Sequence, residues 1–164
     1  MVSLHDRSEK MKPSPKIWDP LRKKEVALTP EERVRQWFIG VLRDSLGVPV
    51  HMMMSEVPMK LGDKSFRADI LVYRRGGAPL MVVECKNESV ALDASVLEQA
   101  LRYNMVLDVP YIVVTNGRST FGFERVPTGS EPLAGTPDGA GIPFRQMKSF
   151  PDWEKMQGQT AQTP

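Results

Sequence analysis

Cysteine and long apolar runs are scarce in this sequence of 164 residues, which contains one cysteine and two histidines. The single cysteine, Cys85, excludes an internal disulfide, and no histidine is near it in the chain, so inert packing is favoured over a nucleophilic role. No apolar run approaches the length of a membrane span, and the N-terminus from Met1 to Pro15 is too polar for a signal peptide. We therefore expect a cytoplasmic protein without a membrane segment.

Net charge is also small. The formal charge is +2, with 41% hydrophobic and 26% charged residues, which is ordinary for a soluble globular protein. A charge of this size does not indicate a polyanionic partner, although it allows a local basic face. The length suits one domain with a sizeable core plus tails.

Composition divides the chain into three segments. Residues 1–15 are polar, contain proline and show no apolar period, so we expect a mobile N-terminal tail. Residues 16–126 carry the periodic patterns of a folded core domain. Residues 127–164 form a Gly/Pro-rich loop and C-terminal extension, with Phe150 and Trp153 as apolar anchors.

Apolar periodicity and turn residues predict an α-β-β-β-α-β order after two short strands within Ile17–Leu28. The expected elements are a helix from Thr29 to Gly47, strands at His51–Leu61, Ser65–Arg74 and Leu80–Asn87, a helix at Asp93–Leu107, and strands at Tyr111–Thr115 and Thr120–Val126. The first three strands form a meander, and the crossover helix makes the next strand parallel to the third. The predicted fold class is mixed α/β, with a four- to five-stranded sheet between helices.

The strand at Leu80–Asn87 places an acid and a base next to an apolar run. Side chains alternate along a strand, so Glu84 and Lys86 point to one face and Cys85 to the other. Charges beside such a run are costly unless they are paired, hydrogen-bonded or bound to metal. An ordinary exposed ion pair at a fraying strand end is the alternative interpretation.

A second acid, Asp69, precedes the apolar part of the neighbouring strand. A hairpin centred on Gly76-Gly77 pairs residues whose numbers sum to 153, which places Asp69 opposite Glu84. Facing carboxylates destabilise a sheet unless a cation lies between them. The sequence therefore predicts an oxygen-only site for Mg²⁺ or Mn²⁺, with Lys86 beside it.

The helix opening at Thr29 offers a further acid. Thr29 suits the N-cap, Pro30 the first helical position and Glu32 the third, so a capping box alone explains Glu32. Glu31 suits the helix dipole equally well. Spacing leaves open whether either acid also faces the metal.

Several motifs in order resemble the PD-(D/E)XK nuclease superfamily, and within it the N-terminal domain of type I restriction enzyme R subunits. The sequence segments that carry the resemblance are TPEERVRQWF, RADILVY, VVECK, EQALRY and YIVVTNG. The resemblance extends over roughly residues 17–123. Ala68 stands where such nucleases often carry proline. R subunits continue into a helicase-type motor for which 164 residues leave no room, so motor-free cutting or a partner chain is expected.

The resemblance implies a restriction-endonuclease-like three-layer fold and a Mg²⁺-dependent deoxyribonuclease. Asp69, Glu84 and Lys86 would be catalytic, with Mg²⁺ (or Mn²⁺) held by Asp69, Glu84, the carbonyl of Cys85 and Glu32. Gln99 and Tyr103 would steady the substrate or the lysine; without the resemblance they are interpreted as a surface glutamine and a core tyrosine. DNA is the implied partner, together with a helicase/translocase or modification subunit on another chain.

Two alternatives stay open at this point. A catalytically silent DNA-binding or assembly module of the same fold fits the missing motor and the nearly neutral charge, and an RNA-directed enzyme fits the same motifs. We expect five basic residues to border the cleft that binds the substrate. These are Arg22, Lys23, Lys24, Arg33 and Arg102.

Overall fold

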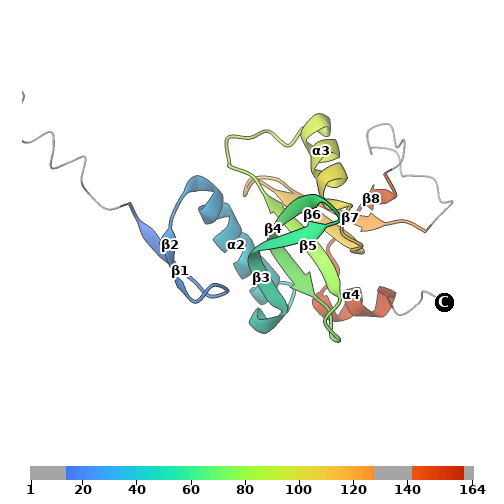
Figure 1. The fold of residues 1–164 in the computed structure, drawn as a ribbon, viewed down its shortest axis with the longest axis horizontal. Helices are drawn as coiled ribbons and strands as arrows, with labels where there is room; N and C mark the ends of the chain where they lie inside the picture. The colour runs from blue at the N-terminus through green and yellow to red at the C-terminus, as the bar shows by residue number, and fades with distance from the viewer. Residues whose placement is uncertain (1–13, 128–141, 161–164) are drawn as a thin grey trace, which may run out of the picture.

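The computed structural model describes residues 14–127 and 142–160 (Figure 1). The strands are β1 (Lys16–Asp19), β2 (Lys24–Ala27), β3 (Met53–Leu61), β4 (Lys64–Tyr73), β5 (Pro79–Cys85), β6 (Tyr111–Thr115), β7 (Thr120–Arg125) and β8 (Phe144–Gln146). The helices are α2 (Pro30–Asp44), the 3-10 turn η1 (Val50–Met52), α3 (Ala94–Asn104) and α4 (Trp153–Thr160). This order contains the predicted α-β-β-β-α-β series.

A mixed six-stranded sheet runs through the described part of the chain in the order β3-β4-β5-β6-β7-β8. Only β5 and β6 pair in parallel, and α3 connects them, as the crossover prediction required. The mixed α/β fold class is therefore confirmed. The sheet is wider than the four to five strands expected, because β8 adds to β7 from the C-terminal segment.

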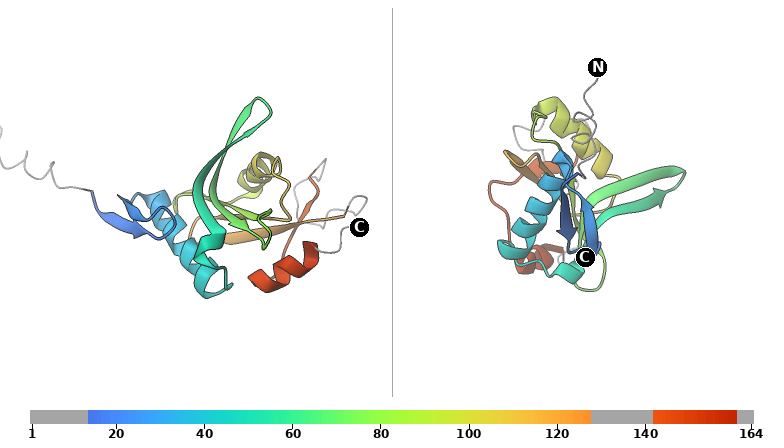
Figure 2. Two further views of the ribbon diagram at one scale, coloured as in Figure 1. Left: turned by 60° about the horizontal axis from the view of Figure 1, so that its bottom comes forward. Right: turned by 90° about the vertical axis from the view of Figure 1, so that its left-hand side faces the viewer.

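Helices cover both faces of this sheet, which gives three layers (Figures 1 and 2). On one face α2 and α4 pack, through residues such as Phe38, Leu42 and Met156, against Val83 of β5. On the other face α3 packs through buried Leu101. Because β5 and β6 are covered on both sides, Leu80–Val83 and Tyr111–Val114 are almost fully buried.

The hairpin between β4 and β5 turns at Gly76 and Gly77, which have φ of 95° and 92°. Glycine takes such angles without a Cβ clash. The predicted register, with numbers summing to 153, holds from Val72↔Met81 to Ile70↔Val83. It shifts at Tyr73, which pairs with Pro79 and not with residue 80, because a bulge follows Val72.

The C-terminal segment contributes to the core. Phe150 packs so closely on Gly122 of β7 that a Cβ there would lie 2.6 Å from the ring. Phe144, Trp153 and Met156 are buried. The described part of segment 127–164 thus shares the hydrophobic core of residues 16–126. The expected mobile tail (except residues 14 and 15) and the expected loop at 127–141 (except Pro127) lie outside the described residues.

Two element boundaries differ from those expected from the sequence. The segment predicted as a strand from His51 begins as η1, and β3 starts only at Met53. Helix α3 ends at Asn104, before Leu107. Among the described residues, no helix combines the length and the apolarity needed to cross a membrane.

Candidate active site

Strands β4 and β5 separate at Asp69. Their ladder ends at Ile70↔Val83, whereas β4 stays paired with β3 as far as Lys64. The β3–β4 ribbon therefore extends well away from the rest of the sheet (Figure 2). At this fork the N–H of Cys85 donates to Oδ2 of Asp69 at 2.8 Å, so the carboxylate accepts a backbone donor where the strands part.

Glu84 and Lys86 lie on the α3 side of the sheet. Lys86 Nζ is 3.2 Å from Oε2 of Glu84, and Asn104 Nδ2 donates to Oε1 at 3.0 Å. Cys85 points the other way into the core beneath α2. Burial, reinforced by the charge of Asp69, raises the pKa of the Cys85 thiol well above its usual value. The predicted alternation along the strand and the predicted core position of Cys85 are both confirmed.

An open cleft of about 400 Å³ lies above Glu84 and Lys86. Its remaining walls come from α3 and include Gln99 and Tyr103, so the structure brings four of the predicted site residues together. Tyr103 is 45% exposed and is not a core tyrosine. Its ring stacks on Phe66 with centroids 4.9 Å apart, and its hydroxyl accepts the N–H of Arg67 at 3.2 Å, which ties α3 to the ribbon.

Asp69 does not line this cleft and meets α2 instead. Arg35 NH2 lies 3.4 Å from Oδ1 of Asp69. Burial raises the pKa of Asp69, and the charge of Glu84 raises it further, against the lowering effects of the Cys85 N–H and Arg35. The predicted pair of residues 69 and 84 is not formed, because the β4–β5 ladder ends at Ile70↔Val83. Asp69 takes its side-chain partner from α2, whereas Glu84 takes one from α3. A shared metal ion stays a prediction.

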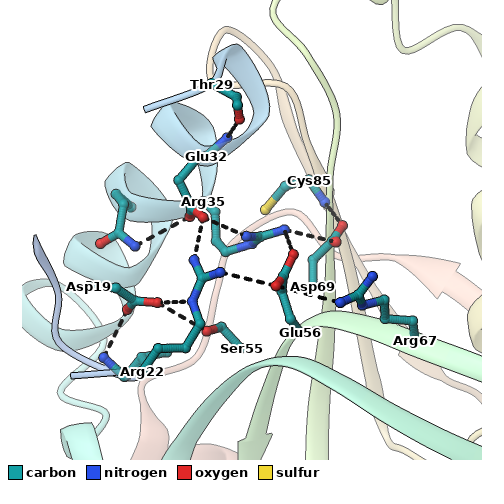
Figure 3. A network of polar contacts seen from close by, with 12 residues as sticks. Asp19, Arg22, Thr29, Glu32, Arg35, Ser55, Glu56, Arg67, Asp69 and Cys85 are labelled. Atoms are coloured by element: carbon teal, nitrogen blue, oxygen red, sulfur yellow. Dashed lines mark hydrogen bonds and ion pairs between the residues drawn. The ribbon is translucent and has the colours of Figure 1, made fainter. Parts of the chain in front are cut away.

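Glu32 does not complete the capping box. Its N–H donates to Oγ1 of Thr29 at 3.1 Å, which confirms the N-cap. The reciprocal bond is absent from the described contacts, because the Thr29 N–H donates to Ala27 and the Glu32 carboxylate turns to Arg22 and Arg35 (Figure 3). Capping therefore explains the Thr29 side chain but not that of Glu32.

A buried network joins four segments on this side (Figure 3). Arg22 pairs with Asp19, Glu32 and Glu56. Arg35 pairs with Glu32 and Glu56. Arg22, which was expected to border the cleft, is not among the residues that line it, and its guanidinium binds three carboxylates.

Glu56 reaches the network through an irregular strand. It has a φ of 51°, a left-handed conformation that is uncommon outside glycine and asparagine. The β3–β4 ladder runs through Ser55↔Ile70 and Val57↔Ala68 but skips Glu56 and Asp69 between them. The irregularity thus falls at two acids that both contact Arg35.

The carboxylate oxygens at the fork are suitable ligands for a hard divalent cation, but the predicted set of ligands is only partly brought together. Asp69 and Glu84 are 27% and 13% exposed, and each of their four oxygens accepts one described contact, which leaves acceptor capacity. Carboxylate oxygens suit Mg²⁺ and Mn²⁺. Glu32 is not grouped with them: within residues 14–127 and 142–160, no three His, Cys, Asp or Glu side chains are arranged to hold a metal.

Sequence reasoning missed Arg35 and Asn104. Arg35 shares the buried face of α2 with Phe38, Ile39 and Leu42, at spacings of three, four and seven residues. A charge at such a core position signals a buried ion pair. Asn104 is 1% exposed, and a buried amide requires partners, but its bond to Glu84 joins residues 20 apart and has no local signal.

Comparisons with solved structures add two similarities. A DUF820 protein from Anabaena variabilis ATCC 29413, described as a candidate nuclease, is 15% identical, with a TM-score of 0.40, over 73% of this chain and 78% of its own. The type IIG restriction endonuclease BpuSI is 20% identical, with a TM-score of 0.34, over 61% of this chain and 11% of its own. Curated proteins gave no match.

A family model gives the decisive result. The model for the type I restriction enzyme R protein N terminus (HSDR_N) matches residues 30–137, more than half of the 164 residues. The matched range contains Asp69, Glu84 and Lys86, together with the cleft residues Gln99 and Tyr103. The chain belongs to the family of type I restriction enzyme R protein N-terminal domains.

Proposed function

We propose that this domain is a Mg²⁺-dependent deoxyribonuclease that hydrolyses phosphodiester bonds in DNA. One arrangement carries the proposal: Glu84 and Lys86 line an open cleft, and the partly buried acid Asp69 lies at the adjoining strand fork. The proposal starts from this set of two acids and a lysine, in which Glu84 contacts Lys86 and burial raises the pKa of Asp69.

Asp69, Glu84 and the carbonyl of Cys85 would hold the metal ion. Bound Mg²⁺ would supply Lewis-acid activation of water and neutralise charge on the phosphate. Lys86 is 36% exposed and keeps donors beyond its contact with Glu84. Its ammonium would orient the attacking water or stabilise developing negative charge in the cleft.

Substrate positioning would come from α3. The Tyr103 hydroxyl accepts from Arg67, so its own proton remains able to donate to a phosphate oxygen. Gln99 lines the same cleft. The exposed Arg67 belongs to the ribbon beside this cleft and would contact the DNA backbone. Such contacts would give sequence-independent binding that weakens as salt rises.

The wider setting follows from the same proposal. The domain would act in the cytoplasm, together with a helicase/translocase or a modification subunit, as membership of a restriction enzyme family suggests for its partners.

A second candidate is a catalytically silent DNA-binding or assembly module. The contact of Arg35 with both Glu32 and Asp69 favours it, because a guanidinium there already neutralises two of the predicted metal ligands. The silent module predicts DNA binding without cleavage and without any need for divalent metal.

One experiment separates these functions. Supercoiled, linear and single-stranded DNA, with single-stranded RNA as a fourth substrate, are incubated with the protein in Mg²⁺, Mn²⁺ or EDTA and resolved on gels. We expect metal-dependent cleavage of DNA that disappears in Asp69→Ala. Binding of DNA without cleavage in either metal would establish the silent module, and cleavage confined to RNA would change the substrate class.

A further inference from the structure

Arg35 lies where three carboxylates converge, as Figure 3 shows. Its NH1 is 2.9 Å from Oε1 of Glu32, and its NH2 is 3.4 Å from Oδ1 of Asp69 and 3.5 Å from Oε1 of Glu56. The side chain is only 7% exposed. The guanidinium therefore bridges Glu32 and Asp69, two of the acids that the sequence predicted to share a metal ion.

Two features of the Arg35 site raise the free energy of the folded state. Among the described contacts, the buried Nε of Arg35 has no hydrogen-bond partner, which leaves a charged group incompletely satisfied. Glu56 reaches the guanidinium from a left-handed backbone conformation. Costs of this kind persist when the surrounding structure enforces them, and they concentrate at functional sites.

We propose that Arg35 is a built-in counter-cation that occupies the side of Asp69 facing Glu32 and so restricts a divalent metal to the Asp69–Glu84 side. Arg35 is a positioning residue in this role, because it acts through Asp69. The part of the inference that concerns a metal at Asp69 and Glu84 rests on the proposed nuclease function. The occupation of the Glu32 side depends only on the contacts of Arg35.

Loss of the guanidinium charge should therefore strengthen metal binding. Among the described contacts, Glu32 would then keep Arg22 as its ion-pair partner, and Glu56 would keep Arg22 and the exposed Arg67. Carboxylates freed in this way are hard oxygen ligands. The effect should require Glu32, because that acid becomes the third ligand only when Arg35 no longer holds it.

The test measures Mn²⁺ affinity by electron paramagnetic resonance in wild type, Arg35→Gln and the double variant Glu32→Gln/Arg35→Gln. We expect Arg35→Gln to bind Mn²⁺ about tenfold more tightly, the scale of one unit charge acting on a divalent ion several ångströms away. The double variant should lose most of that gain. Arg43→Gln is the matched control: it removes the same charge from the exposed end of α2, where Arg43 pairs with Asp44, and should bind like wild type.

Equal or weaker Mn²⁺ binding by Arg35→Gln would overturn the counter-cation role, as would a gain that survives in the double variant. If circular dichroism shows that Arg35→Gln does not fold, Arg35→Lys replaces it. A lysine keeps the charge but cannot bridge two carboxylates as a planar fork, so a smaller gain is expected, and no gain overturns the proposal. A wild type that neither binds Mn²⁺ nor cleaves DNA would defeat the nuclease proposal alone, since tighter binding in the variant would still support the counter-cation.

Discussion

The two sides of the Asp69 fork differ in how far their charges are satisfied. On the α2 side, Asp19 and Glu32 are almost fully buried and are bound by arginines. On the α3 side, Glu84 and Lys86 form a single ion pair at an open cleft, supported by one amide bond from Asn104. The α2 side resembles a structural ion network, whereas the α3 side retains donors and acceptors for a ligand.

This difference suggests a division of labour. A catalytic group must be held within a fraction of an ångström by neighbours that do not themselves react. Arg35, a member of the arginine network, contacts Oδ1 of Asp69 from the α2 side. The Cys85 N–H donates to Oδ2, the other oxygen of this carboxylate. The α3 side then supplies the groups that would meet the substrate. Substitutions on the two sides should therefore separate stability from activity.

The largest effect on stability is expected at Arg22. Arg22→Met removes the shared partner of Asp19, Glu32 and Glu56. Glu32 and Glu56 keep Arg35, but the fully buried Asp19 is left with no ion pair among the described contacts. Breaking a buried ion pair from one side costs about 3–5 kcal/mol, so the free energy of unfolding in urea should fall by that amount. Arg43→Gln, at an exposed and solvent-screened pair, should leave the free energy of unfolding close to that of wild type. Equal losses in both variants would erase the contrast between the two sides.

Lys86→Ala should show the opposite behaviour. Loss of a charge-stabilising donor in an active site lowers the rate by about 10²–10³-fold, so DNA cleavage should become nearly undetectable. The melting temperature should stay the same or rise, because Lys86 is partly exposed and has one acidic partner among the described contacts. Lys155→Ala on α4 is the control for loss of an exposed lysine. Full activity with a lowered melting temperature would make Lys86 a structural residue.

The smallest effect is a change in acid stability at Asp19. Burial alone would raise the pKa of Asp19, but hydrogen bonds from Arg22 and the Leu21 N–H outweigh it, and the pKa is lowered. Such a group stabilises the fold above its unfolded pKa of about 3.8–3.9 and loses that contribution as pH falls through the lower folded value. The urea midpoint of wild type should therefore drop below pH 4, and Asp19→Asn should show a shallower drop from a lower starting value.

Asp44 provides the matched control for this measurement. Its pKa is also lowered, by Arg43, but the pair is exposed and solvent-screened. Asp44→Asn should leave the pH profile close to that of wild type. A profile that shifts as much as that of Asp19→Asn would mean that burial does not distinguish the two aspartates.

Much of the fold could be predicted because its signals are local. Alternation along Leu80–Lys86 separated Glu84 and Lys86 from Cys85, and the glycine pair at 76–77 fixed the register up to Ile70. The N-caps at Thr29 and Asp93 lie where capping chemistry predicts them. β8 escaped prediction because three residues carry too little periodicity to identify a strand.

The sequence by itself determined the element order, the mixed sheet and the common face of Glu84 and Lys86, since each depends on periodicity, turns or a short crossover. Gln99 and Tyr103 were assigned to the cleft only through the family resemblance. Only the tertiary structure decided the partners of the charged groups. Arg22, Arg35 and Glu56 come from separate segments, and a left-handed residue in β3 brings Glu56 to the arginines. Long charged side chains reach any partner within several ångströms. Helical spacing allows Glu32 to pair with Arg35, but only packing determined that Glu32 also pairs with Arg22.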